Sequence, residues 1–283
     1  MTKKVTLFSF FFCFLQCSMA LSNDTLATIE TSGLVFKKSR QISMETEDLF
    51  ISLDNIRVDY TFKNAGLRPV TSLVTFPLPD LELQTPHSIN LEKNLKNPLS
   101  FELKVNGLSL PVKPDVKIND RTQIMKLNYF WSQTFPARKS IRVEHNYLTG
   151  AGSGFPEQAQ EIYCFDQSFK DSLKSLEADL LKKYQASVRD QKMYGTFENH
   201  YKVWLHYHTR RVDYILKTGA NWKGPIKNFK LTVDKGRAEN LISFCWDGPR
   251  DLSNTQITAI KTDFKPAKDL RILIVDTSSM ASD

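Results

Sequence analysis

Beyond its first residues, the chain lacks a long run of apolar side chains. No segment after Leu15 approaches the ~20 consecutive apolar residues of a membrane-spanning helix. The sequence also lacks GxSxG, HExxH, a P-loop, a dinucleotide-binding glycine fingerprint and a carboxylate pair assignable to glycosidase work. Basic runs interleaved with aromatic residues are missing too, which disfavours nucleic acid as a partner. We therefore assign no catalytic residue, expect no cofactor, and predict no transmembrane anchor in the mature protein.

The first residues have the pattern of a secretory signal peptide. Lys3 and Lys4 precede an apolar run from Val5 to Leu15, which is too short to cross a bilayer. Ser18 and Ala20 supply small residues for signal peptidase, so we predict that residues 1–20 are removed. The mature chain then has 283 − 20 = 263 residues and a formal net charge of 7 − 2 = +5. This predicts an exported protein, periplasmic or secreted.

The chain is also poor in cysteine. Cys13 and Cys17 leave with the signal peptide, so the mature protein keeps only Cys164 and Cys245. In an oxidising compartment such a pair most simply forms a disulfide. Closing a loop of 245 − 164 = 81 residues would stabilise the fold by roughly 4 kcal/mol. Two buried free thiols, or a nucleophile, remain the alternatives.

What the sequence does contain is alternation with a period of two, which predicts strands. In NIRVDYTFKN (residues 55–64), apolar residues at even positions alternate with polar ones. Asn106 and Gly107, between FELKV and LSLPV, favour a tight hairpin turn. Pro77 and Pro79 should end the strand that precedes them. We predict a mainly β fold, β-sandwich-like with antiparallel sheets.

The stretch from Tyr129 to Tyr147 offers the best case for chemistry, through Gln133, Glu144 and His145. The same stretch also predicts a β-hairpin, with PARKS (residues 136–140) as its turn. In that arrangement His145 shares the apolar face of its strand, while Glu144 points the opposite way. Because Glu144 and His145 would lie on opposite faces of the strand, they could not both contact the same atom of a substrate. We therefore predict a hairpin with a hydrogen-bonded, partly buried His145.

The pattern divides the mature chain into two halves. TGAGSGFPEQ (residues 149–158) is the candidate boundary between an N-terminal β half, residues 21–150, and a C-terminal half, residues 151–283. In the second half, apolar residues at steps of three and four predict one long amphipathic helix within 166–190. Returning strands follow the helix from Tyr201 onward. We expect both halves to form one domain.

Several motifs spread over the mature chain resemble one family. They are SGLVFKKS, METEDLFISLDNIRVDYTFKN, VTFPLPD, FWSQTFPARKSIRVEHNY, the pair at 163 and 164, YILKTGANWKGPIKNFKLTVDKG and SFCWDG. Together they are similar to the exported bacterial proteins grouped as domain of unknown function 4424. The resemblance implies a bacterial envelope protein, and it carries over no activity or functional residue. Arg138 departs from the pattern, which has glycine there; a type I turn would tolerate either residue.

The loop GANWKGPI (residues 219–226) is the best equipped for binding. It displays Asn221 and Trp222, and an exposed indole beside an amide could stack on a sugar or grip a peptide. The alternative is that Trp222 fills the core, while Gly219 and Gly224 satisfy the turn. We treat Asn221 and Trp222 as candidate binding residues.

The histidines of HYKVWLHYHTRRVD (residues 200–213) are candidate metal ligands. His200, His206 and His208 would share one strand face, and His206 with His208 could chelate a transition metal. No accompanying spacing supports a physiological site, so we predict no metal and keep this pair as the alternative.

A second resemblance links NIRVDYTFKN and VTFPLPD to the β-sandwich module that precedes von Willebrand type A domains in some secreted proteins. ILIVDTSSMASD is similar to the metal-binding start of such a domain, where Asp276 and Ser278 fit but Met280 stands at the third ligand position. We therefore read LRILIV (residues 270–275) as a last strand.

Three functions remain in view. The favoured one is a non-enzymatic binding or structural module of the cell envelope, whose partner is an envelope protein or a glycan. The alternatives are a metal-dependent hydrolase using His200, His206 and His208, and an adhesin-like protein with a metal site at Asp276.

Overall fold

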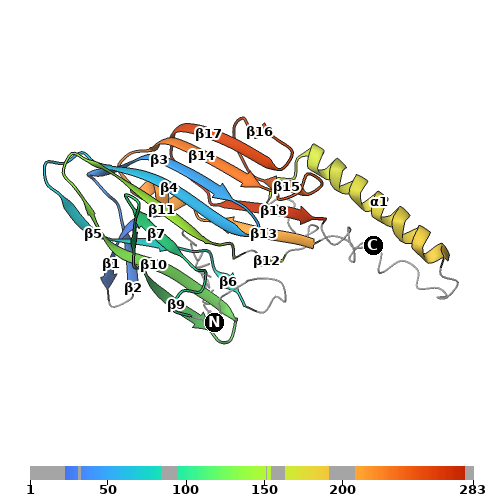
Figure 1. The fold of residues 1–283 in the computed structure, drawn as a ribbon, viewed down its shortest axis with the longest axis horizontal. Coiled ribbons are helices and arrows are strands. Elements are labelled where there is room, and N and C mark those ends of the chain that lie inside the picture. The colour runs from blue at the N-terminus through green and yellow to red at the C-terminus, as the bar shows by residue number, and fades with distance from the viewer. Residues whose placement is uncertain are drawn as a thin grey trace, which may run out of the picture.

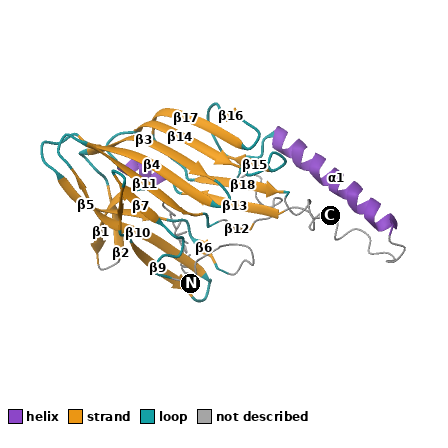
Figure 2. Cartoon of the chain, viewed as in Figure 1, coloured by secondary structure: helices purple, strands orange, loops and turns teal. Residues whose placement is uncertain are grey.

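The computed structural model describes residues 23–30, 33–83, 95–150, 152–153, 163–190 and 208–277. Strands make up most of this part of the chain, and one α-helix extends from the end of the molecule (Figure 2). The mainly β fold predicted from the alternation is confirmed, and all but one of the strand pairs are antiparallel. No helix among the described residues is long and apolar enough to cross a membrane.

Sheet A has six strands in the order β2-β1-β5-β10-β6, and β9 also pairs with β10 (Figure 1). The chain enters this sheet at its N-terminal hairpin and returns to it twice. Its strands are β1 (Thr25–Glu30), β2 (Gly33–Lys37), β5 (Val70–Pro77), β6 (Leu81–Glu82), β9 (Lys113–Asn119) and β10 (Ile124–Phe135). As predicted, the strand of VTFPLPD ends at Pro77.

Sheet B has eight strands in the order β16-β17-β14-β3-β4-β11-β7-β8. Its strands are β3 (Ile42–Ile51), β4 (Asn55–Asn64), β7 (Glu102–Val105), β8 (Leu108–Leu110), β11 (Ser140–Leu148), β14 (Ile226–Asp234), β16 (Asp251–Leu252) and β17 (Gln256–Phe264). The predicted hairpin at Asn106 and Gly107 joins β7 to β8, with φ of 50° and 81° at the two turn residues. The parallel pair β3–β14 brings strands of both halves of the chain into this one sheet.

Sheet C has four strands in the order β12-β13-β18-β15, and the α-helix begins beside it. Its strands are β12 (Gly152–Ser153), β13 (His208–Tyr214), β15 (Leu241–Phe244) and β18 (Leu270–Asp276). Helix α1 spans Gln167–Asp190, and a short 3₁₀ helix, η2, spans Lys217–Asn221. LRILIV is thus a strand, as expected. Residues 213–218 (DYILKT), in the region where returning strands were predicted, instead end β13 and lead into η2.

One hydrophobic core is shared by the three sheets. Each sheet contributes inward-facing side chains to this core. Examples are Phe76 and Tyr129 of sheet A, Tyr60 and Leu231 of sheet B, and Ile272 of sheet C. The alternation read from the sequence places these side chains, because every second residue of a strand faces the same side. The finer prediction of a β-sandwich-like fold stays a prediction.

Helix α1 confirms that a helix forms within 166–190. Its long amphipathic character stays a prediction, because the packing of the helix is described only at its start. Phe169 is buried with Tyr163 and Phe165, and Leu173 and Leu176 pack partly against them. This smaller cluster rests on Leu273 and Val275 of β18. Figure 1 shows the rest of the helix leading away from the sheets.

The predicted hairpin from Tyr129 to Tyr147 is wrong. β10 pairs with β5, β9 and β6 in sheet A, whereas β11 pairs with β4 and β7 in sheet B. The two strands therefore face each other across the core, and the rings of Trp131 and His145 lie 5.4 Å apart. Alternation fixes which face of a strand is buried but not which strand it pairs with, so both strands satisfy the pattern in separate sheets.

Candidate functional site

Strands β3, β4 and β11 carry polar residues on both of their faces, and each face is a candidate site. Inward lie Glu47, Tyr60 and His145, while their outward neighbours are Asp48, Asp59 and Glu144. The predicted opposition of His145 and Glu144 is therefore confirmed. We call the inward group the inner cluster; it comprises Asn23, Asp24, Glu47, Tyr60, His145 and Tyr214.

His145 lies among aromatic rings in the inner cluster. Its side chain is fully buried, and the rings of Phe76, Phe101 and Tyr60 lie 4.8, 5.0 and 5.4 Å from it. Burial lowers the pKa of His145 to about 3, so its imidazole is neutral at physiological pH. Its Nε2 lies 3.6 Å from Asp24 Oδ1, which is not an ion pair while the ring is neutral. The expected hydrogen bond is absent among the described residues, and the ring is fully and not partly buried.

Two carboxyl groups complete the chemistry of the inner cluster. Burial raises the pKa of Glu47 to about 8, although hydrogen bonds from Asn23 and Tyr214 act in the opposite direction. Burial, followed by the charge of Glu47, raises the pKa of Asp24 well above its ordinary value. Asn23 Nδ2 donates to both Glu47 oxygens at 3.1 Å. Glu47 therefore holds its proton in neutral solution, and burial favours the protonated form of Asp24 as well.

The inner cluster anchors the segment that precedes β1. Asn23, Asp24 and Thr25 are each 0% exposed. Thr218 Oγ1 donates to the Asn23 carbonyl at 2.8 Å, and Trp222 Nε1 donates to the Asp24 carbonyl at 2.7 Å. A Cβ at Gly219 would meet Asn23 Nδ2 at 2.9 Å, so a side chain at this position would displace Asn23 from its place beside Glu47. In the described part of the chain these titratable groups are buried, and the hydrogen bonds of Asn23, Thr218 and Trp222 hold the segment before β1 against the core.

Asn221 and Trp222, the predicted binding residues, belong to this anchor. Trp222 is 4% exposed, and its ring packs on Phe62 at 4.5 Å and Phe135 at 6.0 Å. Asn221 Nδ2 donates to Thr25 Oγ1 at 3.1 Å, and Gly224 takes φ of 78° in the turn that follows. The geometry supports the alternative in which Trp222 fills the core. Binding by Asn221 and Trp222 stays a prediction, which a Trp222 variant tests below.

The predicted metal ligands fall mostly outside the described residues. His200, His206, Ser278 and Met280 are not described, and of His208 only its place at the start of β13 is known. Asp276 ends β18. Within the described ranges, no group of three or more His, Cys, Asp or Glu side chains is arranged to hold a metal. The histidine site and the site at Asp276 stay predictions, which metal analysis of the purified mature protein would test.

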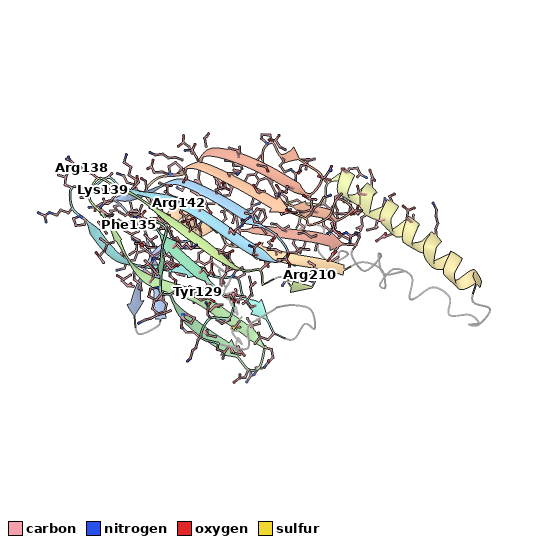
Figure 3. The ribbon with its side chains drawn as sticks, in the orientation of Figure 1. Tyr129, Phe135, Arg138, Lys139, Arg142 and Arg210 are labelled. Atoms are coloured by element: carbon pink, nitrogen blue, oxygen red, sulfur yellow. A yellow bond between two sulfur atoms is a disulfide. The ribbon has the colours of Figure 1, made fainter. Side chains whose placement is uncertain are left out.

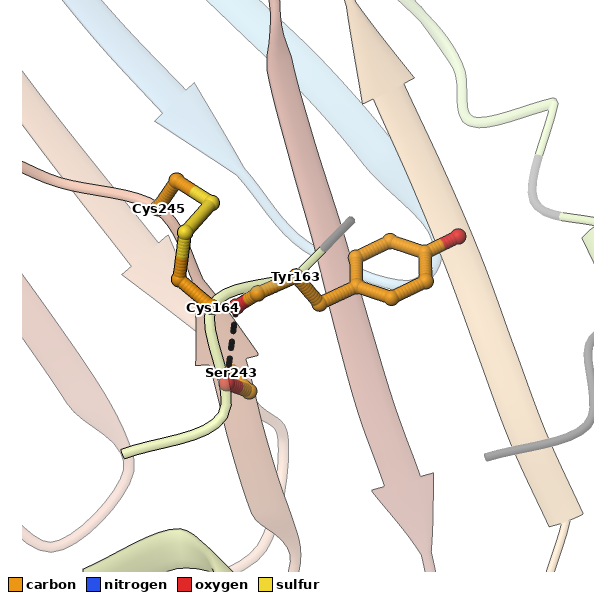
Figure 4. Close-up of a disulfide and its surroundings, with 4 residues drawn as sticks. All are labelled: Tyr163, Cys164, Ser243 and Cys245. Atoms are coloured by element: carbon orange, nitrogen blue, oxygen red, sulfur yellow. Dashed lines mark hydrogen bonds between the residues drawn. A yellow bond between two sulfur atoms is a disulfide. The ribbon is translucent and has the colours of Figure 1, made fainter. Parts of the chain in front are cut away.

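The predicted disulfide is confirmed. Cys164 and Cys245 are bonded, and the bridge ties the turn before α1 to the residue after β15 (Figure 4). Ser243 Oγ donates to the Tyr163 carbonyl at 3.0 Å beside it. The start of the helix is therefore fixed to sheet C by a covalent bond and by a hydrogen bond.

The outward face of sheet B carries the accessible candidate site. A hollow of about 630 Å³ lies over β3, β4, β7, β11, β14 and β17. Along one row of paired positions stand Lys230, Asp48, Asp59, Glu144 and Lys104. Figure 3 labels Arg142 on this sheet. We call this surface the outer face.

Most of the charges on the outer face are paired. Lys230 Nζ lies 3.1 Å from Asp48, and Arg142 contacts Asp59 and lies 3.1 Å from Glu144. Arg57 differs, because its guanidinium lies over the ring of Phe50 at 4.2 Å. No ion pair joins Arg57 to a carboxylate in the described part of the chain.

Sequence reasoning missed Glu47 and the outer face. The sequence does contain a signal for the burial of Glu47. In a strand every second residue faces the same side, so Glu47 faces inward together with Leu49 and Ile51. The register of β3 shifts between Met44 and Thr46, so the inward positions change parity there. The outer face had no comparable signal, because its residues come from six strands whose order the sequence does not give.

Comparison with solved structures shows a shared fold. A Legionella pneumophila protein described as a putative nutrient binding protein is 18% identical, with a TM-score of 0.54, over 90% of this chain and 71% of that one. An M1 zinc metallopeptidase from Deinococcus radiodurans has a TM-score of 0.29 at 10% identity, and the match spans 85% of this chain but 43% of the peptidase. A comparison with curated proteins found no match.

The family is decided by a family model, described as a domain of unknown function (DUF4424), that matches residues 22–124 and 122–273. The chain belongs to this family. The two matched segments together run from before β1 to β18 and take in all three sheets. The resemblance read from the motifs is therefore confirmed for the family itself.

Proposed function

We propose that this family member is a non-enzymatic binding module of the bacterial cell envelope, and that its ligand lies in the hollow of the outer face. The observation that carries the proposal is the contrast in access between the two candidate sites. The perturbed groups of the inner cluster are buried, whereas the hollow of about 630 Å³ is lined by solvent-facing charges. Most of these charges are already paired, which suits recognition of a ligand better than acid–base chemistry.

The hollow favours a small hydrophilic solute with an acidic group. Arg57 is the cation there that stacks on an aromatic ring, and its guanidinium can donate two parallel hydrogen bonds to a carboxylate. This chain shares its fold with a protein described as nutrient binding, and this likeness supports a binding role for the fold but not for particular residues. Fold likeness alone does not define a ligand.

Export is part of the proposal. The predicted signal peptide, residues 1–20, and the disulfide between Cys164 and Cys245 both suit an oxidising compartment outside the cytoplasm. We also propose that residues 21–150 and 151–283 form one domain of β-sandwich type, since sheet B takes strands from both halves. Sequencing the N-terminus of protein recovered from the cell envelope should begin at Leu21; retention of residues 1–20 in that protein would argue against export by cleavage.

The binding test is a calorimetric screen of the mature protein against acidic sugars, amino acids and short peptides. Arg57→Gln should lower the affinity for an acidic solute by about tenfold or more, since a hydrogen bond to a charged group contributes roughly 1.5–3 kcal/mol. Lys113→Gln is the matched control, because it removes one exposed positive charge on sheet A, away from the hollow. A solute that binds both variants equally well does not use the hollow, and this part of the proposal would fail.

A further inference from the structure

The connections at one end of the molecule form a single surface. They are residues 37–41, 63–69, 136–140 and 222–225. Four backbone hydrogen bonds tie them to one another and to the start of β3: Asn64 N to Lys139 O at 3.0 Å, Arg138 N to Gly66 O at 3.1 Å, Ala65 N to Gln41 O at 3.3 Å, and Lys223 N to Ile42 O at 2.8 Å. Figure 3 shows Arg138 and Lys139 at this end, which is opposite helix α1. The four connections are thus held in fixed positions relative to one another.

This surface is strongly basic. None of the four connections contains Asp or Glu. They carry exposed cations, which we call the basic end: Lys37, Lys38, Arg40, Lys63, Arg68, Arg138, Lys139 and Lys223. Within the described chain no ion pair involves these residues. Glu45, an acid on the neighbouring part of β3, is already bonded to Lys227 at 2.7 Å.

An apolar side chain stands among these cations. Leu67 is 73% exposed, and Arg68 and Pro69 follow it in the same connection. A soluble polyanion has no apolar layer to receive a leucine. The boundary between lipid headgroups and acyl chains does have one, and it is reached by apolar residues flanked by Lys and Arg.

We infer that the basic end binds the surface of an anionic phospholipid membrane, with Leu67 entering the headgroup boundary. The basic side chains supply attraction to the lipid phosphates, which increases affinity about fivefold for each Lys or Arg near the surface. Because this end lies opposite α1 along the long axis, docking would leave the rest of the molecule directed away from the bilayer (Figure 1). The outer face, with its separate ligand, is not needed for this contact.

Vesicle sedimentation of the full mature chain tests the inference. The wild type should bind vesicles of phosphatidylcholine mixed with phosphatidylglycerol, should not bind phosphatidylcholine alone, and should lose binding as salt is added. The variant K38Q/R40Q/R138Q/K139Q should bind at least ~100-fold more weakly, at about fivefold for each charge removed. The control K113Q/K117Q/R121Q/K126Q removes the same charge from exposed positions on β9, β10 and the turn between them. It should bind nearly as well as the wild type.

A second variant separates membrane docking from simple attraction to negative charge. Leu67→Ser should weaken vesicle binding severalfold at constant charge, while leaving retention on heparin unchanged. Absence of binding to the anionic vesicles would overturn the inference, and so would an equal loss in the control variant. Binding to heparin without binding to vesicles would replace the membrane by a soluble polyanion. Unaltered circular dichroism and melting temperatures would show that all variants are folded.

Discussion

The inner cluster and the outer face are built from neighbouring residues of the same strands, yet they have opposite character. Glu47, fully buried, is protonated at neutral pH, whereas Asp48, the next residue, is solvent-facing and paired with Lys230. His145 and Glu144 differ in the same way. A strand with a period of two thus places buried groups that stabilise the fold on one face, and accessible charged groups on the other.

The difference teaches how to read polar residues in a β protein. A perturbed pKa is often taken to indicate a functional site, but the inner cluster shows the structural origin of such shifts. Its groups are shifted chiefly by burial, and they hold the segment at Asn23 and Asp24 in place. The outer face, in contrast, is a candidate binding site because solvent reaches it and because charged side chains line it.

The largest expected effect lies on the inner side, at Trp222. Replacing Trp222 with Ala should destabilise the protein by about 3–5 kcal/mol, because a buried large aromatic is truncated. Lys230→Gln on the outer face should cost less than ~1 kcal/mol, as expected for an exposed ion pair. Chemical denaturation measures both. A small effect of Trp222→Ala together with lost ligand binding would restore the predicted binding role of Asn221 and Trp222.

The disulfide should have the next largest effect. Cys164→Ser with Cys245→Ser should lower the free energy of unfolding by roughly 4 kcal/mol, given the sequence separation of 81 residues. Thiol titration of the mature wild type, denatured but unreduced, should find no free thiol. The double variant should keep the ligand affinity of the outer face; if it loses that affinity, the two regions are coupled through sheet C.

The third prediction uses pH to isolate the inner cluster. Burial raises the pKa of Glu47 to about 8 from an ordinary value of 4.5, so between these values the folded state holds a proton that the unfolded state has released. Stability must therefore fall as pH rises through this window. His145, whose pKa is lowered to about 3, acts in the opposite direction only below its ordinary value of 6.5. Asp24 acts in the same direction as Glu47.

The clean measurement thus compares pH 6.5 with pH 8. Over this interval Glu47 should cost roughly 2 kcal/mol of stability. Glu47→Gln should make the fall in stability smaller and leave the share that Asp24 contributes, while Asp48→Asn, the outward neighbour, should leave the pH dependence as in the wild type. Equal slopes in all three proteins would mean that Glu47 is not the buried acid that controls stability.

Sequence patterns predicted the faces of the strands well and their partners poorly. The burial of Tyr60, Tyr129 and His145 follows from alternation alone, and the turn at Asn106 and Gly107 follows from its dipeptide. The partners of β10 and β11 did not follow, because pairing depends on contacts distant in the sequence. For the same reason the outer face could not be predicted, since it requires β14 to lie beside β3.

The smallest expected effect lies in the turn between β10 and β11, which joins sheet A to sheet B. The sequence predicted a type I turn that tolerates either arginine or glycine at position 138, but Arg138 has φ of 55°, in the left-handed region that favours glycine. This conformation costs a residue with a Cβ about 1–2 kcal/mol, and glycine's greater freedom in the unfolded chain offsets about 0.4–1 kcal/mol of that. Arg138→Gly should therefore stabilise the protein by up to ~1.5 kcal/mol in urea denaturation. Arg138→Ala, which removes the charge but keeps the Cβ, should give no such gain. If both variants gain equally, the source is relief of repulsion at the basic end and not the backbone of the turn.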